Sequence, residues 1–278
     1  MIKIYHYFGR FGKEFFSILE THKIKYQVSY APSDPEPIYS FDLKCPSSNF
    51  DNQYAAVSLY VKPIDIRAEY TKADLSKAAL IAIRPKRQCV SVLNYEEAML
   101  HYCSTPPYNS GCSYIHDQEQ VDLLQIDRLP KRTKTAFFSE DTGFEFLFCD
   151  KRAYNVLCSS NICGVEFKPV LSKNKKVYPD FYQITSDNKI SREIISLGHS
   201  ERYDYCPICG AKKIVLNNTD QLHLNMKQLG EESDFYVTES IFGEGAAYPL
   251  YIISQHCFEL LKDNDLIYHL VLTPLVCE

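Results

Sequence analysis

The sequence predicts an α+β fold of mixed sheets and short helices, with two similar strand–helix–strand repeat units in its C-terminal part. Two observations lead to this prediction. Residues 146–171 and residues 250–276 each follow the order apolar strand, polar cap, short helix, turn, apolar strand, proline. The helices in both stretches are too short to be stable alone, so each must pack its apolar face on a sheet.

The two stretches also match position by position. Asp150 corresponds to Ser254 at an offset of 104 residues, and each is a good N-cap because its side-chain oxygen can accept from a backbone N–H of the first turn. The other matches are Leu147 with Tyr251, Tyr154 with Phe258, Leu157 with Leu261 and, one residue further on, Pro169 with Pro274. An internal repeat is therefore predicted; the alternative is that two generic units look alike by chance.

Residues 1–115 are predicted to form a separate N-terminal α+β region. Its expected elements are a strand over 1–7, a helix with apolar positions from Phe11 to Leu19, a strand over Ile24–Val28, a loop over Ala31–Pro37, strands over Ala55–Val61 and Ala78–Ile83, a helix from Asn94 through about Tyr102 and a turn-rich connection over Ser104–Gly111. Asn94 and Glu97 resemble a capping box, which marks the start of that last helix.

The remainder is predicted to divide into residues 116–172, the first repeat unit, and residues 173–278, the second. The first includes a strand at Leu123–Leu129 and the second a matching strand at Leu222–Leu229, after the basic linker Lys173–Lys176. The second unit also contains the sequence Cys-Pro-Ile-Cys-Gly, followed by a strand over Ala211–Leu216.

Composition and charge narrow the function. The 278 residues carry 30 basic and 35 acidic side chains, a net charge of −5, which argues against a nucleic-acid partner because such binding depends on neutralising phosphates. The first residues lack a signal-peptide pattern, and no apolar run is long enough to span a membrane. Eleven cysteines without a secretion signal fit a reducing cytoplasm, with free thiols or a metal site.

Cys206 and Cys209 form the sharpest local motif. Two thiolates three residues apart, with Gly210 closing the turn, can bind one zinc ion, but a structural zinc site needs four ligands. Cys158 and Cys163 are the expected other half; looser options are Cys103, Cys112, His199 and Cys257. Two buried thiols without metal are the alternative. A redox pair is disfavoured because a strand, not a helix, is predicted to follow the motif.

Two turns are candidate partner-binding surfaces. Glu231, Glu232 and Asp234 form an acidic turn that could attract a basic partner, and Phe242 and Glu244 lie in a glycine-containing loop. Plain solvated loops are the alternative. The chain has no serine-hydrolase elbow, phosphate-binding loop or zinc-protease motif, and His256 and Cys257 point in different directions on a helix, so no enzyme activity is expected.

The order of CPICG, Asp-Phe-Tyr, a glycine-rich turn, PLYIISQHCFELLKDNDL and a closing TPL resembles the bacterial double-CXXCG-motif proteins and related immunity proteins of polymorphic toxins. The resemblance covers residues 203–275, with an echo at 120–171. It departs from the pattern at Cys158 and Cys163, which are separated by four residues instead of two.

This resemblance implies an immunity protein that binds a cognate secreted toxin in the cytoplasm and occludes its active site. Two alternatives stay open: a zinc-containing regulatory or nucleic-acid-binding module, and a cysteine- or zinc-dependent enzyme. The resemblance implies nothing for residues 1–110.

Overall fold

The computed structural model describes residues 1–31, 34–63, 65–86, 88–102, 117–130, 134–140, 146–197, 203–206, 210, 212–216, 221–229, 232–239, 241–243 and 248–278. The described residues form two compact units, an N-terminal unit over Met1–Asp74 and a C-terminal unit that begins at Leu75. The predicted α+β class is confirmed, because both sheets and short helices are present. The sequence-based division into three parts, with boundaries at residues 115 and 172, differs from this division into two units, and it stays a prediction.

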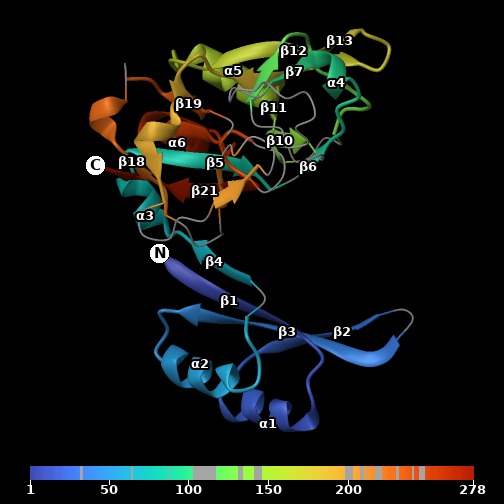
Figure 1. Cartoon of the computed structure of the whole chain (residues 1–278), viewed down its shortest axis with the longest axis vertical. Coiled ribbons are helices and arrows are strands. Elements are labelled where there is room, and N and C mark those ends of the chain that lie inside the picture. Colours follow the sequence, from blue (N-terminus) through green and yellow to red (C-terminus); the bar gives the residue numbers. More distant parts are fainter. Residues whose placement is uncertain are drawn as a thin grey trace. The chain divides into compact units, whose positions relative to one another are not determined.

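The N-terminal unit is a four-stranded antiparallel sheet with two helices. Its elements are β1 (Ile2–Gly9), α1 (Lys13–Thr21), β2 (Tyr26–Ala31), β3 (Asp34–Cys45), α2 (Phe50–Ser58) and β4 (Asp65–Glu69). The strand order β2-β3-β1-β4 with this chain order is the split βαββαβ arrangement. Figure 1 shows α1 and α2 side by side on one face of the sheet.

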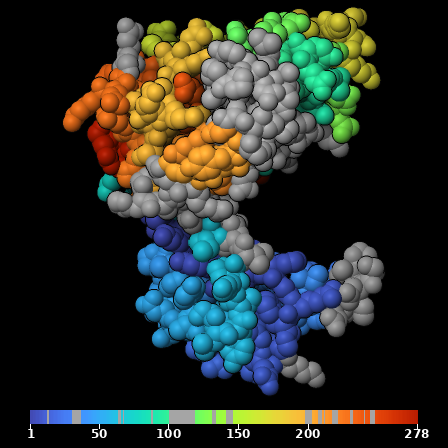
Figure 2. Space-filling view, in the orientation of Figure 1, coloured from blue at the N-terminus to red at the C-terminus, as the bar shows by residue number. Residues whose placement is uncertain are grey.

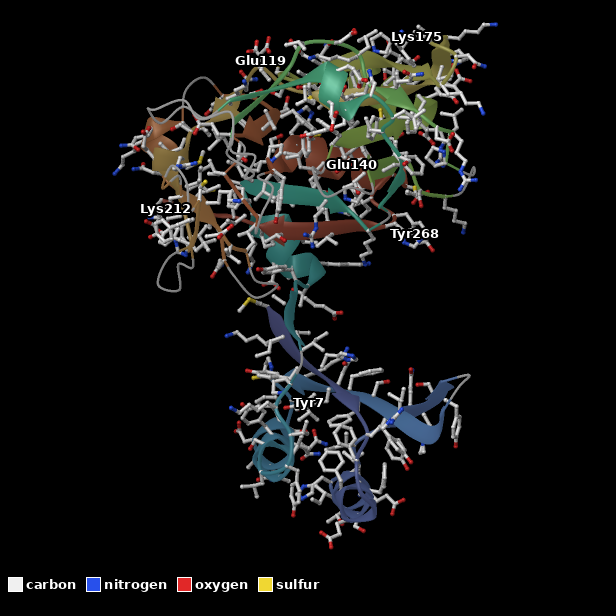
Figure 3. All side chains as sticks on the ribbon, turned by 45° about the vertical axis from the view of Figure 1, so that its right-hand side comes forward. Tyr7, Glu119, Glu140, Lys175, Lys212 and Tyr268 are labelled. Carbon is white, nitrogen blue, oxygen red and sulfur yellow. The ribbon has the colours of Figure 1, made fainter. Side chains whose placement is uncertain are left out.

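An aromatic core joins this sheet to its helices. Tyr7 of β1 and Phe41 of β3 stack with their ring centroids 4.7 Å apart, and Phe15 of α1 packs on the same ring. Figure 3 shows Tyr7 between the sheet and the helices. Because side chains alternate along a strand, the residues next to Tyr7 and Phe41 point to the opposite, helix-free face.

Two predictions for this unit were wrong. The segment Ala55–Val61, predicted as a strand, belongs mostly to α2; the buried residues Phe50 and Val57 and the half-buried Tyr54 lie at helical spacing. The segment Ala31–Pro37, predicted as a loop, is largely strand, because β3 begins at Asp34 and pairs with β2. Pro35 and Pro37 lie in β3, beyond the part that pairs with β1, where prolines are tolerated near the end of a hairpin.

The C-terminal unit contains more and shorter strands. Its elements are α3 (Lys72–Lys77, at the boundary), β5 (Leu80–Pro85), β6 (Gln88–Val90), α4 (Tyr95–Ala98), β7 (Met99–Tyr102), β8 (Asp117–Gln120), β9 (Gln125–Ile126), β10 (Phe137–Glu140), β11 (Leu147–Asp150), α5 (Lys151–Ser159), β12 (Glu166–Ser172), β13 (Val177–Thr185), β14 (Lys189–Ile190), a 3₁₀ helix (Arg192–Ile194), β15 (Ile195–Ser196), β16 (Tyr203–Tyr205), β17 (Lys212–Ile214), β18 (His223–Leu224), a 3₁₀ helix (Met226–Gln228), β19 (Phe235–Thr238), β20 (Tyr251–Ser254), α6 (Gln255–Asp263), β21 (Leu270–Pro274) and β22 (Val276–Cys277).

Two larger sheets dominate this unit. One has six strands in the order β6-β10-β11-β13-β12-β9, and the other has five in the order β14-β19-β20-β5-β21. The smaller sheets are β15-β18-β22, β16-β17 and β7-β8. The strand predicted at Ala78–Ile83 is confirmed as β5. The strands predicted at Leu123–Leu129 and Leu222–Leu229 are reduced to β9 and β18, and the helix predicted through Tyr102 ends at Ala98, where β7 begins.

The stretches β11–α5–β12 and β20–α6–β21 have the same local build. Asp150 accepts from the backbone N–H groups of Arg152 and Ala153 at 3.0 and 3.3 Å, and Ser254 accepts from that of Cys257 at 3.0 Å. Both predicted N-caps are therefore confirmed, and both helices have nine residues. After the helices, Asn161 and Asp265 each adopt a left-handed backbone, with φ of 50° and 58°.

The strand registers of the two sheets also correspond. In the first sheet, Ile184 of β13 lies between Leu147 of β11 and Phe167 of β12. In the second, β5 takes that central place. There, Ile83 lies between Tyr251 of β20 and Leu272 of β21. The central strand thus follows the unit along the chain in one sheet and precedes it in the other. Descent of the two stretches from one repeat stays a prediction.

One hydrophobic core connects the two stretches. It contains Ala153 and Leu157 from α5, Phe258 and Leu261 from α6, and buried residues of both large sheets. A buried hydrogen bond crosses it, in which the backbone N–H of Leu147 donates to the Tyr251 hydroxyl at 3.2 Å. Among the described helices, none is long and apolar enough to cross a membrane.

Candidate functional site

A polar cavity lies on the helix-free face of the N-terminal sheet. Its volume is about 300 Å³, and β1, β3 and the start of β2 line it through His6, Lys25, Tyr26, Gln27, Ser40, Phe41 and Asp42. Since Phe41 lies in the aromatic core, its neighbours Ser40 and Asp42 present their side chains to the cavity.

A histidine–aspartate pair forms one wall of this cavity. His6 and Asp42 are directly opposite each other in the antiparallel register of β1 and β3, and His6 Nδ1 lies 2.7 Å from Asp42 Oδ1. Both side chains are partly buried. The carboxylate fixes the orientation of the imidazole ring and leaves Nε2 as the nitrogen that can face a ligand.

The remaining polar groups come from β2 and its entrance. Tyr26 is opposite Phe41, so the register continued by one residue places Lys25 opposite Asp42. In the next row, Gln27 is opposite Ser40. The cavity therefore combines an oriented imidazole, an amide and a hydroxyl on β1, β2 and β3 with an ammonium group from the residue before β2.

A second feature of this unit is the outer edge of β2. No described strand pairs with that edge, and residues 26–31 include neither a charged residue nor a proline. Val28 is 44% exposed and Tyr30 is 68% exposed. The opposite edge strand, β4, instead carries Asp65, Arg67 and Glu69 at alternate positions. In Figure 2, the N-terminal unit, which contains both edges, is coloured blue to cyan.

The Cys-Pro-Ile-Cys-Gly motif lies at the tip of the β16–β17 hairpin. Cys206 is buried, its carbonyl accepts from the backbone N–H of Gly210 at 2.9 Å, and Gly210 has φ of +74°, a left-handed backbone that favours glycine. This agrees with the strand predicted after the motif. Cys209 lies outside the described residues, so zinc binding by Cys206 and Cys209 stays a prediction.

Cys158 and Cys163 lie at the end of α5, and both are exposed. Across the described residues, no group of three or more His, Cys, Asp and Glu side chains could hold a metal ion, so these two and Cys206 do not form a set of ligands. Instead, Cys158 contacts the Tyr154 hydroxyl and raises its pKa. Among the looser options, Cys257 is buried in the core, and Cys103, Cys112 and His199 lie outside the described residues.

Asp234, predicted to bind a partner, is used inside the fold. Its carboxylate accepts from Ser254 Oγ at 2.6 Å and from the Cys163 backbone N–H at 3.2 Å, and it lies 3.2 Å from His256 Nδ1. Burial alone would raise the pKa of Asp234, but these partners outweigh burial and lower it. With only 17% of its side chain exposed, Asp234 links the end of α5 to the N-terminus of α6.

The other residues predicted to contact a partner differ in their exposure. Phe242 has no exposed surface; it packs in the core and forms bridges to Ile214 and Tyr248, so its ring does not reach a partner. Burial of a large aromatic ring removes apolar surface from water and so lowers the free energy of the fold, which favours a core position over an exposed one. Glu232 is exposed, as predicted for a surface residue, and Glu231 and Glu244 lie outside the described residues.

No family model and no curated protein matches this chain. Sequence reasoning missed the His6–Asp42 pair because neither residue belongs to a local motif. The sequence predicts a strand over residues 1–7, but the register that brings Asp42 opposite His6 is not readable from it.

Proposed function

We propose that this chain is a binding protein that neutralises a secreted bacterial toxin in the cytoplasm by occluding its active site, without chemistry of its own. The observation that supports it best is the open, uncharged edge of β2. The resemblance of residues 203–275 to immunity proteins supports the same conclusion from the other end of the chain.

An edge strand presents unpaired backbone N–H and C=O groups, and proteins usually protect it with charges, prolines or bulges. Residues 26–31 of the β2 edge include neither a charged residue nor a proline, and β2 pairs regularly with β3 up to a register shift between Tyr30 and Ala31. A partner strand can therefore add to β2 and extend the sheet, with main-chain hydrogen bonds giving affinity and the exposed Val28 and Tyr30 giving apolar contact.

Inhibition would be stoichiometric, with each chain occupying one toxin molecule. A strand of six residues is about 20 Å long, so strand addition covers only part of a standard interface of roughly 1,600 Å². The rest would come from surfaces next to β2. Aromatic residues with polar tips, such as Tyr30, are common anchors of such interfaces.

Co-expression with a toxin encoded beside this gene tests the proposal. The wild-type chain is expected to restore growth and to co-purify with the toxin. The double variant Val28→Lys/Tyr30→Lys should lose both effects, because lysines on an edge strand oppose strand addition. The matched control is Val177→Lys, which changes a similarly exposed valine of β13.

Protection that survives in the folded double variant would rule out the β2 edge as the contact. Absence of any protection or complex by the wild-type chain would overturn the immunity function itself.

A further inference from the structure

We infer that the cavity formed by His6, Lys25 and Asp42 binds a small organic ligand through an oxyanion group, a phosphate or a carboxylate. This inference goes beyond the proposed toxin binding and does not depend on it. It is based on the charge of the cavity, on its unused hydrogen-bonding groups and on its size.

The positive charge of the cavity comes from Lys25. Asp42 lies 2.7 Å from His6 and is paired with it. Lys25 is exposed and forms no ion pair with any described residue. Its ammonium therefore adds a positive charge to the cavity, and an anionic group would be attracted to it.

The unused hydrogen-bonding groups surround the same space. Asp42 occupies Nδ1 of His6, so Nε2 is the ring nitrogen left for a ligand. Within the described chain, the side chains of Gln27 and Ser40 form no hydrogen bond, and they lie opposite each other in the next row of the sheet. Hydrogen-bonding groups from β1, from β3 and from the start of β2 thus line one cavity, as at sites that bind phosphate and carboxylate oxygens.

The size and the surroundings favour a small organic molecule. A volume of about 300 Å³ is at the lower end of the range for ligand pockets. Phe8, opposite Ser40 on β1, is 47% exposed and offers an apolar surface on the same face. A metal ion fits poorly, because Lys25 faces the cavity and the described residues provide no third ligand.

Histidine-selective NMR of the full chain tests the inference. The signals of His6, assigned with a His6→Gln variant, are followed while inorganic phosphate, glycerol 3-phosphate or acetate is added. A saturable shift of the His6 signals is expected with at least one of them. Saturation by the two phosphate compounds assigns a phosphate ligand, and saturation by acetate alone assigns a carboxylate.

Two lysine variants complete the test. Lys25→Gln should weaken binding about tenfold, the effect of losing one charge-assisted hydrogen bond. Lys62→Gln, which removes another exposed lysine of the same unit, should leave affinity unchanged. The inference fails if no compound gives a saturable shift of His6. It also fails if both lysine variants weaken binding equally, because the effect would then be general electrostatic attraction.

Discussion

Gly164 follows α5 at a point where the structure leaves no room for a side chain. Its φ is +82°, a left-handed backbone, and a Cβ atom there would overlap Asn188 Nδ2, Ser233 Oγ and the carbonyl oxygen of Phe235. These atoms are joined to each other, since Asn188 donates to Ser233 Oγ at 2.8 Å and Ser233 donates to the Phe235 oxygen at 3.2 Å. Gly164→Ala must therefore displace a connected set of hydrogen bonds.

The expected cost follows from two contributions. A left-handed backbone costs alanine about 1–2 kcal/mol, and each displaced hydrogen bond costs about 1 kcal/mol. We expect Gly164→Ala to lower the free energy of unfolding of the C-terminal unit by about 4 kcal/mol. Gly210→Ala is the matched control, because Gly210 has φ of +74° but no atom of the described residues lies within 4 Å of the place that a Cβ would take. It should cost only about 1–2 kcal/mol.

Urea unfolding followed by circular dichroism measures both variants. The midpoint for Gly164→Ala should be much lower than that for Gly210→Ala, with similar slopes. Equal losses in the two variants would show that backbone conformation alone matters at Gly164, and that the overlap with Asn188 and Ser233 relaxes at no cost.

Four further predictions concern the C-terminal unit. Ser254→Ala should lower the free energy of unfolding by about 1–2 kcal/mol in urea, because it removes the N-cap of α6. Internal partners lower the pKa of Asp234 from 3.8, so its ionised carboxylate stabilises the fold above pH 3.8, and this stabilisation is lost as the pH falls well below 3.8. The difference in unfolding free energy between wild type and Asp234→Asn should therefore shrink at such low pH. A difference that does not change with pH would contradict the prediction. A thiol reagent should label the exposed Cys158 and Cys163 in the native chain but Cys257, whose pKa burial raises to about 12, only after unfolding; mass spectrometry identifies the sites. If Cys206 and Cys209 share a zinc ion, elemental analysis should find zinc in the wild type and less in Cys206→Ser.

The parts of the fold that depend on local rules could be predicted from the sequence. The N-caps Asp150 and Ser254 were found because a polar residue precedes each short apolar helix, and their side-chain hydrogen bonds are present. The strand β17 was predicted because an apolar strand pattern follows the Cys-x-x-Cys-Gly turn, whereas its partner β16 was not predicted.

The parts that depend on distant pairing could not be predicted. His6 and Asp42 meet only because β1 and β3 pair in one register, and no local pattern encodes it. Phe242 was mistaken for a surface residue because its glycine neighbours indicate a turn, while burial of the ring depends on Ile214 and Tyr248. The open β2 edge is likewise a property of the assembled sheet.

The central position of β5 has a consequence for synthesis of the chain. Both strands that flank it, β20 and β21, lie near the C-terminus, so β5 leaves the ribosome long before either partner exists. At about 5–20 residues per second, the delay is roughly 10–30 s. The N-terminal unit contains all its own strands and can complete its sheet during that interval. The apolar residues of β5 have no such option, and the nascent chain must keep them from pairing wrongly until β20 and β21 have been synthesised.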